Sequence, residues 1–358
     1  MEQKLFEGLK VVELASVLAG PAVGMFFAEL GAEVTKIENR RTGGDVTRQW
    51  KSKTEPAEAT VSAYYSSVNY NKTSLLLDLR ESDELNKVYR LVKEADIVIS
   101  NFKKGDDTKL GLDYHRLKQI KPNLIYAHLL GFASAPDRTA YDAVLQAETG
   151  FMSMNGTEES GPLKFPVAIM DLFAAHQMKE GILAALWRRE KTGKGAKVEV
   201  TLEESGISSL VNQASNYLMN GTVPGLSGSL HPNIAPYGET FNCKDGKPVV
   251  LAIGNNLHFE KMCRLLNASA IAENPNYKDN QSRLKNRSQL AKDLKSAFAK
   301  MNRSEIMAAM IAENVPVGAI KTLEEVFAEQ TAKDMILESD MEGRKTKRVS
   351  GVGFRLGQ

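Results

Sequence analysis

The sequence predicts an α/β fold, with a mostly parallel sheet in a large domain and a smaller α+β domain. Between Lys10 and Leu202, short apolar runs alternate with longer amphipathic runs, which is typical of βαβ units and therefore of a Rossmann-like sheet. From Gly221 the pattern changes. The segment Gly221–Gly228 is rich in glycine and is typical of a linker, and hairpin and helical patterns follow it.

The apolar runs place the strands of the large domain. We expect strands at Lys10–Leu14, Glu33–Ile37, Ser74–Asp78, Asp96–Ser100, Leu124–His128 and Lys197–Leu202. The amphipathic runs between them predict helices near Ala22–Leu30, Ser82–Glu94 and Leu172–Arg189.

The smaller domain is expected to open with a hairpin. Residues Glu239–Ile253 alternate in the manner of two strands, and the Asp-Gly pair within Lys244–Lys247 favours a tight turn. Helical patterns follow at Leu257–Leu266, Arg283–Met301 and Ser304–Glu313. Near the end of the chain, the basic cluster Arg344–Arg348 predicts the solvated edge of a late hairpin.

Composition narrows the class of protein. The chain has 358 residues, of which 42% are hydrophobic and 25% charged, and a formal net charge of +2, which gives no strong case for nucleic acid. The two cysteines, Cys243 and Cys263, argue against a disulfide framework, favour a reducing compartment and lack a metal-ligand spacing. No apolar run approaches the roughly 20 residues that span a bilayer, and the start has no secretory core. We therefore expect a cytoplasmic protein that does not bind membranes.

Asp171 is the candidate catalytic residue. It lies where the apolar run Phe165–Met170 meets the helical pattern Leu172–Trp187. A carboxylate at a helix start accepts hydrogen bonds from free backbone N–H groups and lies at the positive end of the helix dipole, and both effects favour the ionised form, a usable nucleophile. Because aspartate is also a common structural cap, the position alone leaves both roles open.

The surrounding pattern resembles the class III CoA-transferases, the family that includes formyl-CoA, carnitine and bile-acid CoA-transferases. The match follows the family's order and spacing over nearly the whole chain. It is carried by Leu9–Pro21 running to Gly31–Glu38, by Asn71–Leu79, Ala95–Phe102 and Tyr141–Gly150, and by Asp171 with Gly181–Leu186 and Lys191–Gly195.

The resemblance implies an architecture and a chemistry. Asp171 would be the nucleophile that attacks an acyl-CoA and then carries CoA as an aspartyl thioester to a carboxylic acid. No metal, flavin, nicotinamide or other cofactor would be needed. The large domain would comprise residues 1–220, completed by 331–358, around a small domain of residues 221–330, and two open-ring chains would interlock as a homodimer.

The resemblance also implies a CoA site. Most of its positions fall at the end of a predicted strand or in the loop after it, where ligands bind in open α/β sheets. They are Leu18, Ala19, Arg40, Leu77, Asp78, Leu79, Arg80, Asn101, Phe102, Lys103, Lys109, Thr139, Ala140, Tyr141 and Asp142. A single lysine among them would more simply be a solvated charge, so the prediction is that they share one face.

Several departures from the formyl-CoA type bear on the acid. Leu18 stands where that type has a glutamine, Thr139 stands where it has a lysine, and Asn39–Arg41 carries one residue more. In place of its glycine-rich loop the chain has Ser229–Tyr237, in which His231 could polarise an acyl group or be merely structural. Oxalate is therefore not the expected acceptor.

Two rival readings remain open. An α-methylacyl-CoA racemase shares the fold but needs two acid/base groups, and those racemases have a His-Asp pair where this chain has Tyr141–Asp142. A dinucleotide-binding Rossmann protein lacks support because Ala15–Pro21 has no G-x-G-x-x-G pattern. A family member that binds CoA without turnover would be expected to have lost Asp171.

Overall fold

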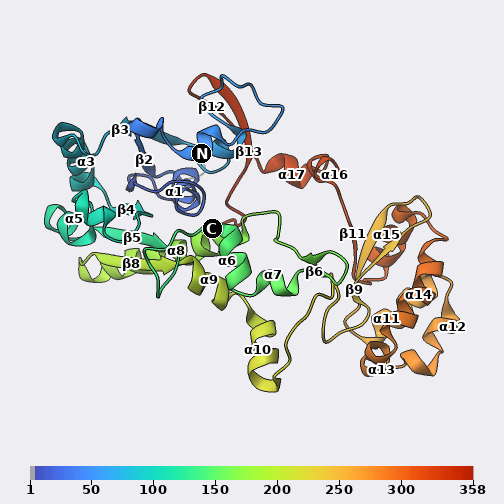
Figure 1. Ribbon diagram of the computed structural model, residues 1–358. Coiled ribbons are helices and arrows are strands. Elements are labelled where there is room, and N and C mark those ends of the chain that lie inside the picture. Colours follow the sequence, from blue (N-terminus) through green and yellow to red (C-terminus); the bar gives the residue numbers. More distant parts are fainter. Residues whose placement is uncertain (1–4, 358) are drawn as a thin grey trace. The chain divides into compact units, whose positions relative to one another are not determined.

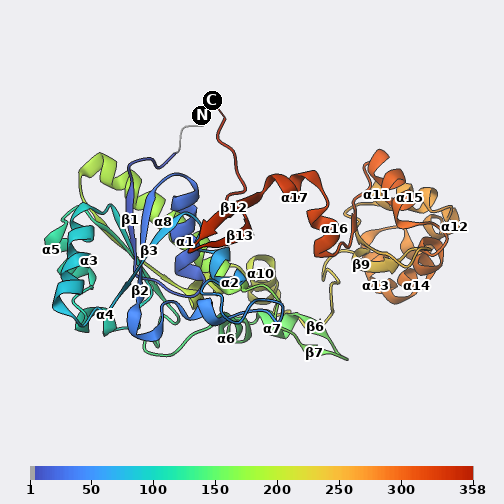
Figure 2. The same cartoon turned by 90° about the horizontal axis from the view of Figure 1, so that it is seen from above.

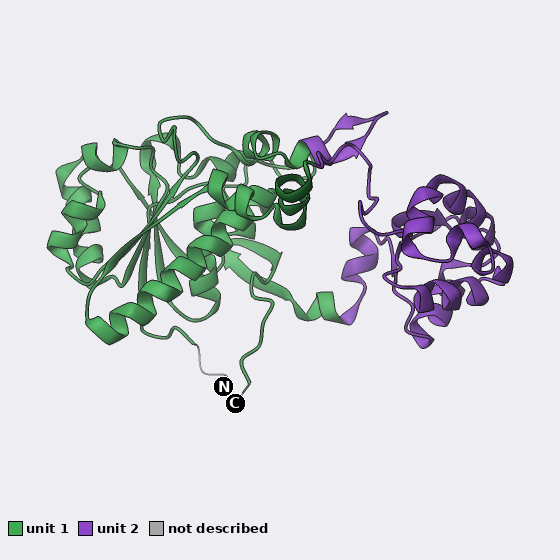
Figure 3. Ribbon diagram, turned by 90° about the horizontal axis from the view of Figure 1, so that it is seen from below, with its two compact units in different colours: residues 1–152, 164–221, 331–358 green, residues 153–163, 222–330 purple. Residues whose placement is uncertain are grey.

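The computed structural model describes residues 5–357 and divides the chain into two compact units, which are described separately (Figure 3). The larger unit comprises residues 1–152, 164–221 and 331–358, and the smaller comprises 153–163 and 222–330. The segment 153–163 departs from the sequence expectation, which placed it in the large domain. It folds into a small ribbon of β6 (Gly156–Thr157) and β7 (Gly161–Pro162), and Thr157 bridges to Ser227. That pairing joins it to the smaller unit.

A parallel six-stranded sheet forms the centre of the larger unit (Figures 1 and 2). Its strands are β1 (Lys10–Glu13), β2 (Glu33–Asn39), β3 (Lys72–Leu77), β4 (Ile97–Ser100), β5 (Ile125–Leu130) and β8 (Ala196–Thr201). Their order, β3-β2-β1-β4-β5-β8, is that of a Rossmann sheet with β8 as the sixth strand. The predicted α/β fold with a mostly parallel sheet is confirmed. The order reverses between β1 and β4, and ligands bind at the carboxyl ends of the strands beside such a point.

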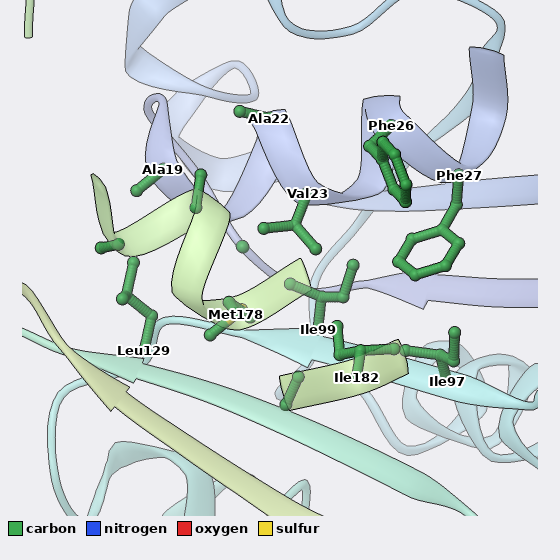
Figure 4. Packing of buried hydrophobic residues seen from close by; sticks show 14 of the residues in the cluster. Ala19, Ala22, Val23, Phe26, Phe27, Ile97, Ile99, Leu129, Met178 and Ile182 are labelled. Atoms are coloured by element: carbon green, nitrogen blue, oxygen red, sulfur yellow. The ribbon is translucent and has the colours of Figure 1, made fainter. Parts of the chain in front are cut away.

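Helices cover both faces of this sheet because alternate strand residues point to opposite sides. On one face, α1 (Ala19–Glu29) and α8 (Ile169–Thr192) pack on Ile97 and Ile99, with Val23, Phe27 and Ile182 between them (Figure 4). On the other face, α3 (Ser82–Glu94) and α5 (Tyr114–Ile120) pack on residues that include Val12 and Val98.

Both helices of the first face begin three residues before the sequence expectation. Helix α1 starts at Ala19 rather than Ala22, because Pro21 is tolerated in the first turn of a helix. Helix α8 starts at Ile169 rather than Leu172, so Asp171 lies within its first turn and not at its cap.

The remaining elements of the larger unit are short. They are α2 (Ala63–Ser67), α4 (Asp106–Lys109), α6 (Asp142–Glu148), α7 (Phe151–Met154), α9 (Leu202–Ser208), α10 (Val211–Asn220), α17 (Gln330–Asp334), β12 (Ile336–Met341) and β13 (Arg344–Val349). Strands β12 and β13 form the expected late hairpin, but its basic cluster is not wholly solvated. Lys345 and Lys347 are exposed, whereas the Arg348 side chain is buried against Glu29 of α1.

The smaller unit is the expected α+β structure. Strands β9 (Tyr237–Asn242) and β10 (Pro248–Ala252) form the predicted hairpin, and β11 (Val317–Ala319) joins it in an antiparallel sheet. Its helices are α11 (Asn256–Leu265), α12 (Ser269–Ala272), α13 (Asn280–Lys285), α14 (Arg287–Phe298), α15 (Arg303–Ala312) and α16 (Leu323–Phe327). The helical pattern predicted over Arg283–Met301 is confirmed for the most part by α14, and its first residues belong to α13, which ends before Asn286.

Among residues 5–357, no helix combines the length and the hydropathy that a membrane span requires. In the same residues, no group of three or more His, Cys, Asp or Glu side chains is placed to hold a metal ion.

Candidate active site

The predicted CoA positions follow the carboxyl ends of neighbouring strands of the sheet. Leu77–Arg80 ends β3, Arg40 follows β2, Leu18 and Ala19 follow β1, Asn101–Lys103 follows β4, and Thr139–Asp142 lies in the connection after β5. Parallel strands present their carboxyl ends at one edge, so these positions share that edge. A cavity of about 520 Å³ opens there, lined by Ser16, Asp45, Leu79 and Phe102 among others. Its size suits part of a cofactor-sized ligand.

Asn101 joins the loops after β1 and β4. Its Oδ1 accepts a hydrogen bond of 3.1 Å from the Ser16 backbone N–H, and its Nδ2 donates one of 2.9 Å to the Ser16 carbonyl. Both ends of the amide are therefore engaged with protein. Asn101 therefore holds the loop at the switch point, and its predicted contact with CoA stays a prediction.

Arg40 and Asp78 are brought together by Glu84 of α3, which the sequence analysis missed. Arg40 Nη1 lies 2.8 Å from Glu84 Oε1, and the Asp78 backbone N–H donates to the other oxygen of Glu84. The Asp78 carboxylate accepts a hydrogen bond of 3.2 Å from the Arg80 N–H. The exposed guanidinium of Arg40 is thus fixed at the ends of β2 and β3, where it can meet an anionic group.

Lys103 and Thr139, predicted from distant parts of the chain, are neighbours. Lys103 Nζ donates a hydrogen bond of 2.7 Å to Thr139 Oγ1. Ala140, next in the chain, lies so close to Gly131 that a Cβ on that glycine would sit 2.2 Å from the Ala140 Cβ. Lys109 is more separate: it lies on α4, is exposed, and pairs with Asp106 at 2.9 Å.

The loop after β1 is held in an unusual conformation. Val17 has φ of 74°, which is rare for a β-branched residue, and its N–H donates a 3.1 Å hydrogen bond to Asp45. The Asp45 carboxylate also lies 3.1 Å from Lys36 Nζ, which in turn lies 2.9 Å from Glu13. A buried network of charges therefore sets the backbone just before Leu18 and helix α1.

Burial leaves this network little water, so each charge depends on its partners. Lys72 lies 2.7 Å from the second oxygen of Glu13, and Arg48 binds both oxygens of Glu38. Sequence reasoning did not identify the network. The available signal was charged residues within strand patterns, since such side chains are almost never fully buried unless paired.

Asp171 is 9% exposed, and its carboxylate makes no hydrogen bond within residues 5–357. Burial, together with the charge of Asp142, raises its pKa to about 7. The hydrogen bonds from free helix N–H groups that were expected to hold Asp171 ionised are not made within residues 5–357, and burial and the like charge of Asp142 favour the protonated form. Shifts of this size in the pKa of buried carboxyl groups are typical of functional sites, which makes Asp171 a candidate.

The capping aspartate of helix α8 is Asp142. Its Oδ1 accepts a hydrogen bond of 2.8 Å from the Met170 backbone N–H, and its Oδ2 accepts one of 2.6 Å from Gln146. Both of its carboxylate oxygens thus have protein partners, and its predicted contact with CoA stays a prediction. Tyr141 before it is exposed at 52% and remains accessible to a ligand.

Tyr64 of α2 is a further site residue that the sequence analysis missed. Burial and the nearby charges of Asp171 and Asp142 raise its pKa to about 12, so it stays protonated and can donate a hydrogen bond. The ring of Trp50 meets its ring edge-on at a centroid distance of 5.0 Å. No sequence motif marked either aromatic residue.

His231 lies in the smaller unit. Its Nδ1 accepts a hydrogen bond of 3.1 Å from the Asn233 N–H, and its carbonyl accepts one of 2.6 Å from Arg287. Both contacts shape its own loop. Its suggested part in polarising an acyl group stays a prediction.

The family model, the similar sequences and the similar solved structure agree with one another. The model of CoA-transferase family III matches residues 6–358. A succinate–glutarate CoA-transferase from Agrobacterium fabrum is 36% identical over 96% of this chain and 87% of its own length. The human succinyl-CoA:glutarate CoA-transferase is 33% identical over 98% of this chain and 79% of its own. Among solved structures, a CaiB/BaiF family protein from Brucella suis superposes with a TM-score of 0.83 at 36% identity, covering 98% of this chain and 92% of the other.

Proposed function

Because this chain belongs to CoA-transferase family III and moves CoA from an acyl-CoA to a carboxylic acid, we propose that Asp171 carries the CoA between them. The observation that supports this role is the Asp171 carboxylate itself. It is buried at the start of helix α8, has no hydrogen-bond partner in the described residues and is not the cap of its helix. Oxygen lone pairs left free in this way are available to attack a carbonyl carbon.

The first half-reaction loads CoA onto the enzyme. An oxygen of Asp171 attacks the thioester carbonyl. The C–S bond then breaks, which releases CoA as its thiolate and leaves a mixed anhydride between Asp171 and the donor acid. The thiolate then attacks the aspartyl carbonyl, the anhydride C–O bond breaks, and the donor acid departs as its carboxylate. Asp171 is left as a CoA thioester.

The second half-reaction reverses these steps with another acid. The acceptor carboxylate attacks the aspartyl thioester, which releases CoA thiolate and forms a new anhydride. Attack of the thiolate on the acceptor's carbonyl gives the new acyl-CoA and regenerates Asp171. Each tetrahedral intermediate needs N–H or O–H donors for its oxyanion, and the protonated Tyr64 is one candidate.

The relatives support a class of acid. Two of them are named for succinate or succinyl-CoA together with glutarate, and Leu18 presents an apolar side chain at the start of α1. We propose acids with an apolar carbon chain next to the reacting carboxyl group, in preference to oxalate. We further propose that the reaction uses no cofactor and takes place in the cytoplasm.

A homodimer forms part of the same proposal. Helix α10 has no buried residue, and Tyr217, Leu218 and Met219 on it are exposed at 55%, 78% and 80%. Large apolar side chains exposed together on one helix favour an interface. We propose that a second copy of this chain packs against helix α10.

The racemase reading has less support. A racemase needs two groups that exchange protons with the α-carbon of the thioester. At the position in question, Tyr141 takes the place of histidine, and both oxygens of Asp142 are held by Met170 and Gln146.

The direct test is mass spectrometry of the protein after incubation with succinyl-CoA and other acyl-CoAs. We expect a CoA adduct on the peptide that contains Asp171, and none in Asp171→Asn. Ordinary turnover by the purified Asp171→Asn protein would overturn the mechanism. Exchange of the α-proton without transfer to an acid would favour the racemase.

A further inference from the structure

One buried side chain near the site has no part in the chemistry above. We propose that Gln146 is a positioning residue: its amide fixes the segment that leads into helix α8 and, through Asp142, the place of the Asp171 carboxylate. The inference rests on the proposed function and deepens it.

The amide of Gln146 is fully used within the protein. The residue is 1% exposed. Its Oε1 accepts a hydrogen bond of 2.6 Å from the Phe165 N–H, and its Nε2 lies 3.3 Å from the Phe165 carbonyl. A side-chain amide that both donates to and accepts from one backbone residue acts as a neighbouring strand would. It holds Phe165 in place although the Phe165 side chain is exposed.

The same amide reaches the start of helix α8 through Asp142. Gln146 lies one turn after Asp142 on α6, a spacing at which glutamine and aspartate side chains meet. Nε2 donates a 2.6 Å hydrogen bond to Asp142 Oδ2, and Asp142 Oδ1 receives the Met170 N–H at 2.8 Å. Two fixed points, Phe165 and Met170, therefore bracket the turn before Asp171.

Few other contacts hold this segment. Residues 164–167 are exposed, and the other side-chain hydrogen bond to this backbone in the described chain comes from exposed Lys164, 3.3 Å from the Phe165 carbonyl. The first N–H groups of a helix have no acceptor within the helix, so without Asp142 the Met170 N–H would lack one. Release of the clamp would let the first turn of α8 shift, and Asp171 shifts with it.

A small shift matters because the reacting atoms must approach to about 3–3.5 Å, and a displacement of about 1 Å can cost about 100-fold in rate. Both ends of the Gln146 amide are hydrogen-bonded within the protein, so we do not expect Gln146 to contact the acyl-CoA or the acceptor acid. Its effect should therefore appear in the chemical step rather than in binding.

The experiment compares Gln146→Met with Gln177→Met. Gln177 is an exposed glutamine on α8, so the control makes the same change of side chain at a solvent-facing position. With succinyl-CoA and glutarate as substrates, we expect Gln146→Met to lower kcat by about 10- to 100-fold while KM for succinyl-CoA stays within about twofold. Gln177→Met should match wild type in both. Equal kcat for the two variants would overturn the positioning role.

A second variant, Gln146→Glu, supplies a readout that a merely space-filling role would not move. When protonated, this glutamic acid can donate to Asp142 as the amide does; when ionised, it repels Asp142 and loses that donor. The titratable groups that face this position are Asp142 and, beyond it, Asp171 and Tyr64. We expect its kcat relative to wild type to recover as pH falls from 8 to 5. A relative kcat that does not change with pH would contradict the proposal.

The two proposals fail differently. Absence of an Asp171 adduct in wild type would remove the proposed mechanism whatever the Gln146 variants do. A wild-type adduct with full kcat in Gln146→Met removes only the positioning role. If Gln146→Met does not fold, as judged by tryptophan fluorescence, the pH dependence of Gln146→Glu decides alone.

Discussion

The carboxylate of Asp142 accepts a hydrogen bond of 2.8 Å from the backbone N–H of Met170, the residue before Asp171. The sequence left two roles open for Asp171, that of a structural cap and that of a nucleophile. The structure gives the capping role to Asp142. Asp142 caps helix α8, and Asp171 keeps both oxygens free of hydrogen bonds within the described chain. The consequence is a like charge near Asp171, which adds to burial in raising the pKa of Asp171 to about 7.

The raised pKa makes stability depend on pH in a definite direction. A carboxyl group whose pKa is raised on folding from 3.8 to about 7 loses stability as pH rises through that window, because the unfolded chain ionises first. Well above pH 7 the full loss of stability is present, up to about 4 kcal/mol. Asp171→Asn removes it.

We therefore expect Asp171→Asn to be more stable than wild type at pH 8 and similar to it near pH 4. Urea unfolding followed by tryptophan fluorescence measures this, since Trp50 and Trp187 both lie in the larger unit. Other titrating groups cancel in the difference between the two proteins. A difference that does not grow with pH would show that Asp171 is ionised at little cost.

The buried charge network predicts a large effect of Lys36→Met. Lys36 neutralises Glu13 and Asp45, so its loss leaves two buried carboxylates short of a partner. Removing one member of a buried ion pair destabilises a protein by about 3–5 kcal/mol. Lys10→Met is the matched control, because the Lys10–Glu94 pair is exposed to solvent and its loss should change stability far less. Similar unfolding midpoints in urea for the two variants would contradict this account.

The sequence revealed much of the fold because periodicity and strand ends are local signals. The parallel sheet and the grouping of the CoA positions at one edge follow from the alternation of apolar runs and from where each run stops. What sequence could not reveal is how side chains from separate elements share hydrogen bonds. Asn101 holding Ser16, and Asp142 capping α8, depend on which segments meet in space.

The start of helix α8 shows this limit most clearly. The apolar run Phe165–Met170 concealed the helix start at Ile169, because its cap comes from Asp142 in another helix. Local capping signals precede a helix directly, and this one lies far away in the chain. The sequence therefore placed Asp171 near a helix start, which the structure confirms, but it could not reveal that the hydrogen bonds expected for Asp171 go to Asp142.

The homodimer proposal predicts that no active monomer exists. Because interlocked chains cannot separate without partial unfolding, sedimentation of wild type should show a dimer down to the lowest measurable concentration. Leu218→Asp places a charge on exposed α10 and should lower the yield of folded dimer, whereas Lys197→Asp on an exposed strand position should not. A folded, active monomer at low concentration would refute the proposal.

Leu18 predicts which acids are accepted. It is the N-cap residue of α1, half-buried and packed against the core on that face of the sheet, at the edge shared by the CoA positions. Its side chain offers no hydrogen bond, and a buried polar acyl group left without a partner would lose roughly 1–3 kcal/mol. Acids with an apolar chain next to the reacting carboxyl group, such as succinate or propionate, should therefore be preferred over oxalate.

Competition between paired acceptors at equal concentration, for wild type and Leu18→Gln, measures this preference. We expect the substitution to raise the relative rate of oxalate by about 10-fold or more, which corresponds to about 1.4 kcal/mol. If oxalate is the best acceptor of the wild type, or if Leu18→Gln changes no relative rate, Leu18 does not line the acyl pocket.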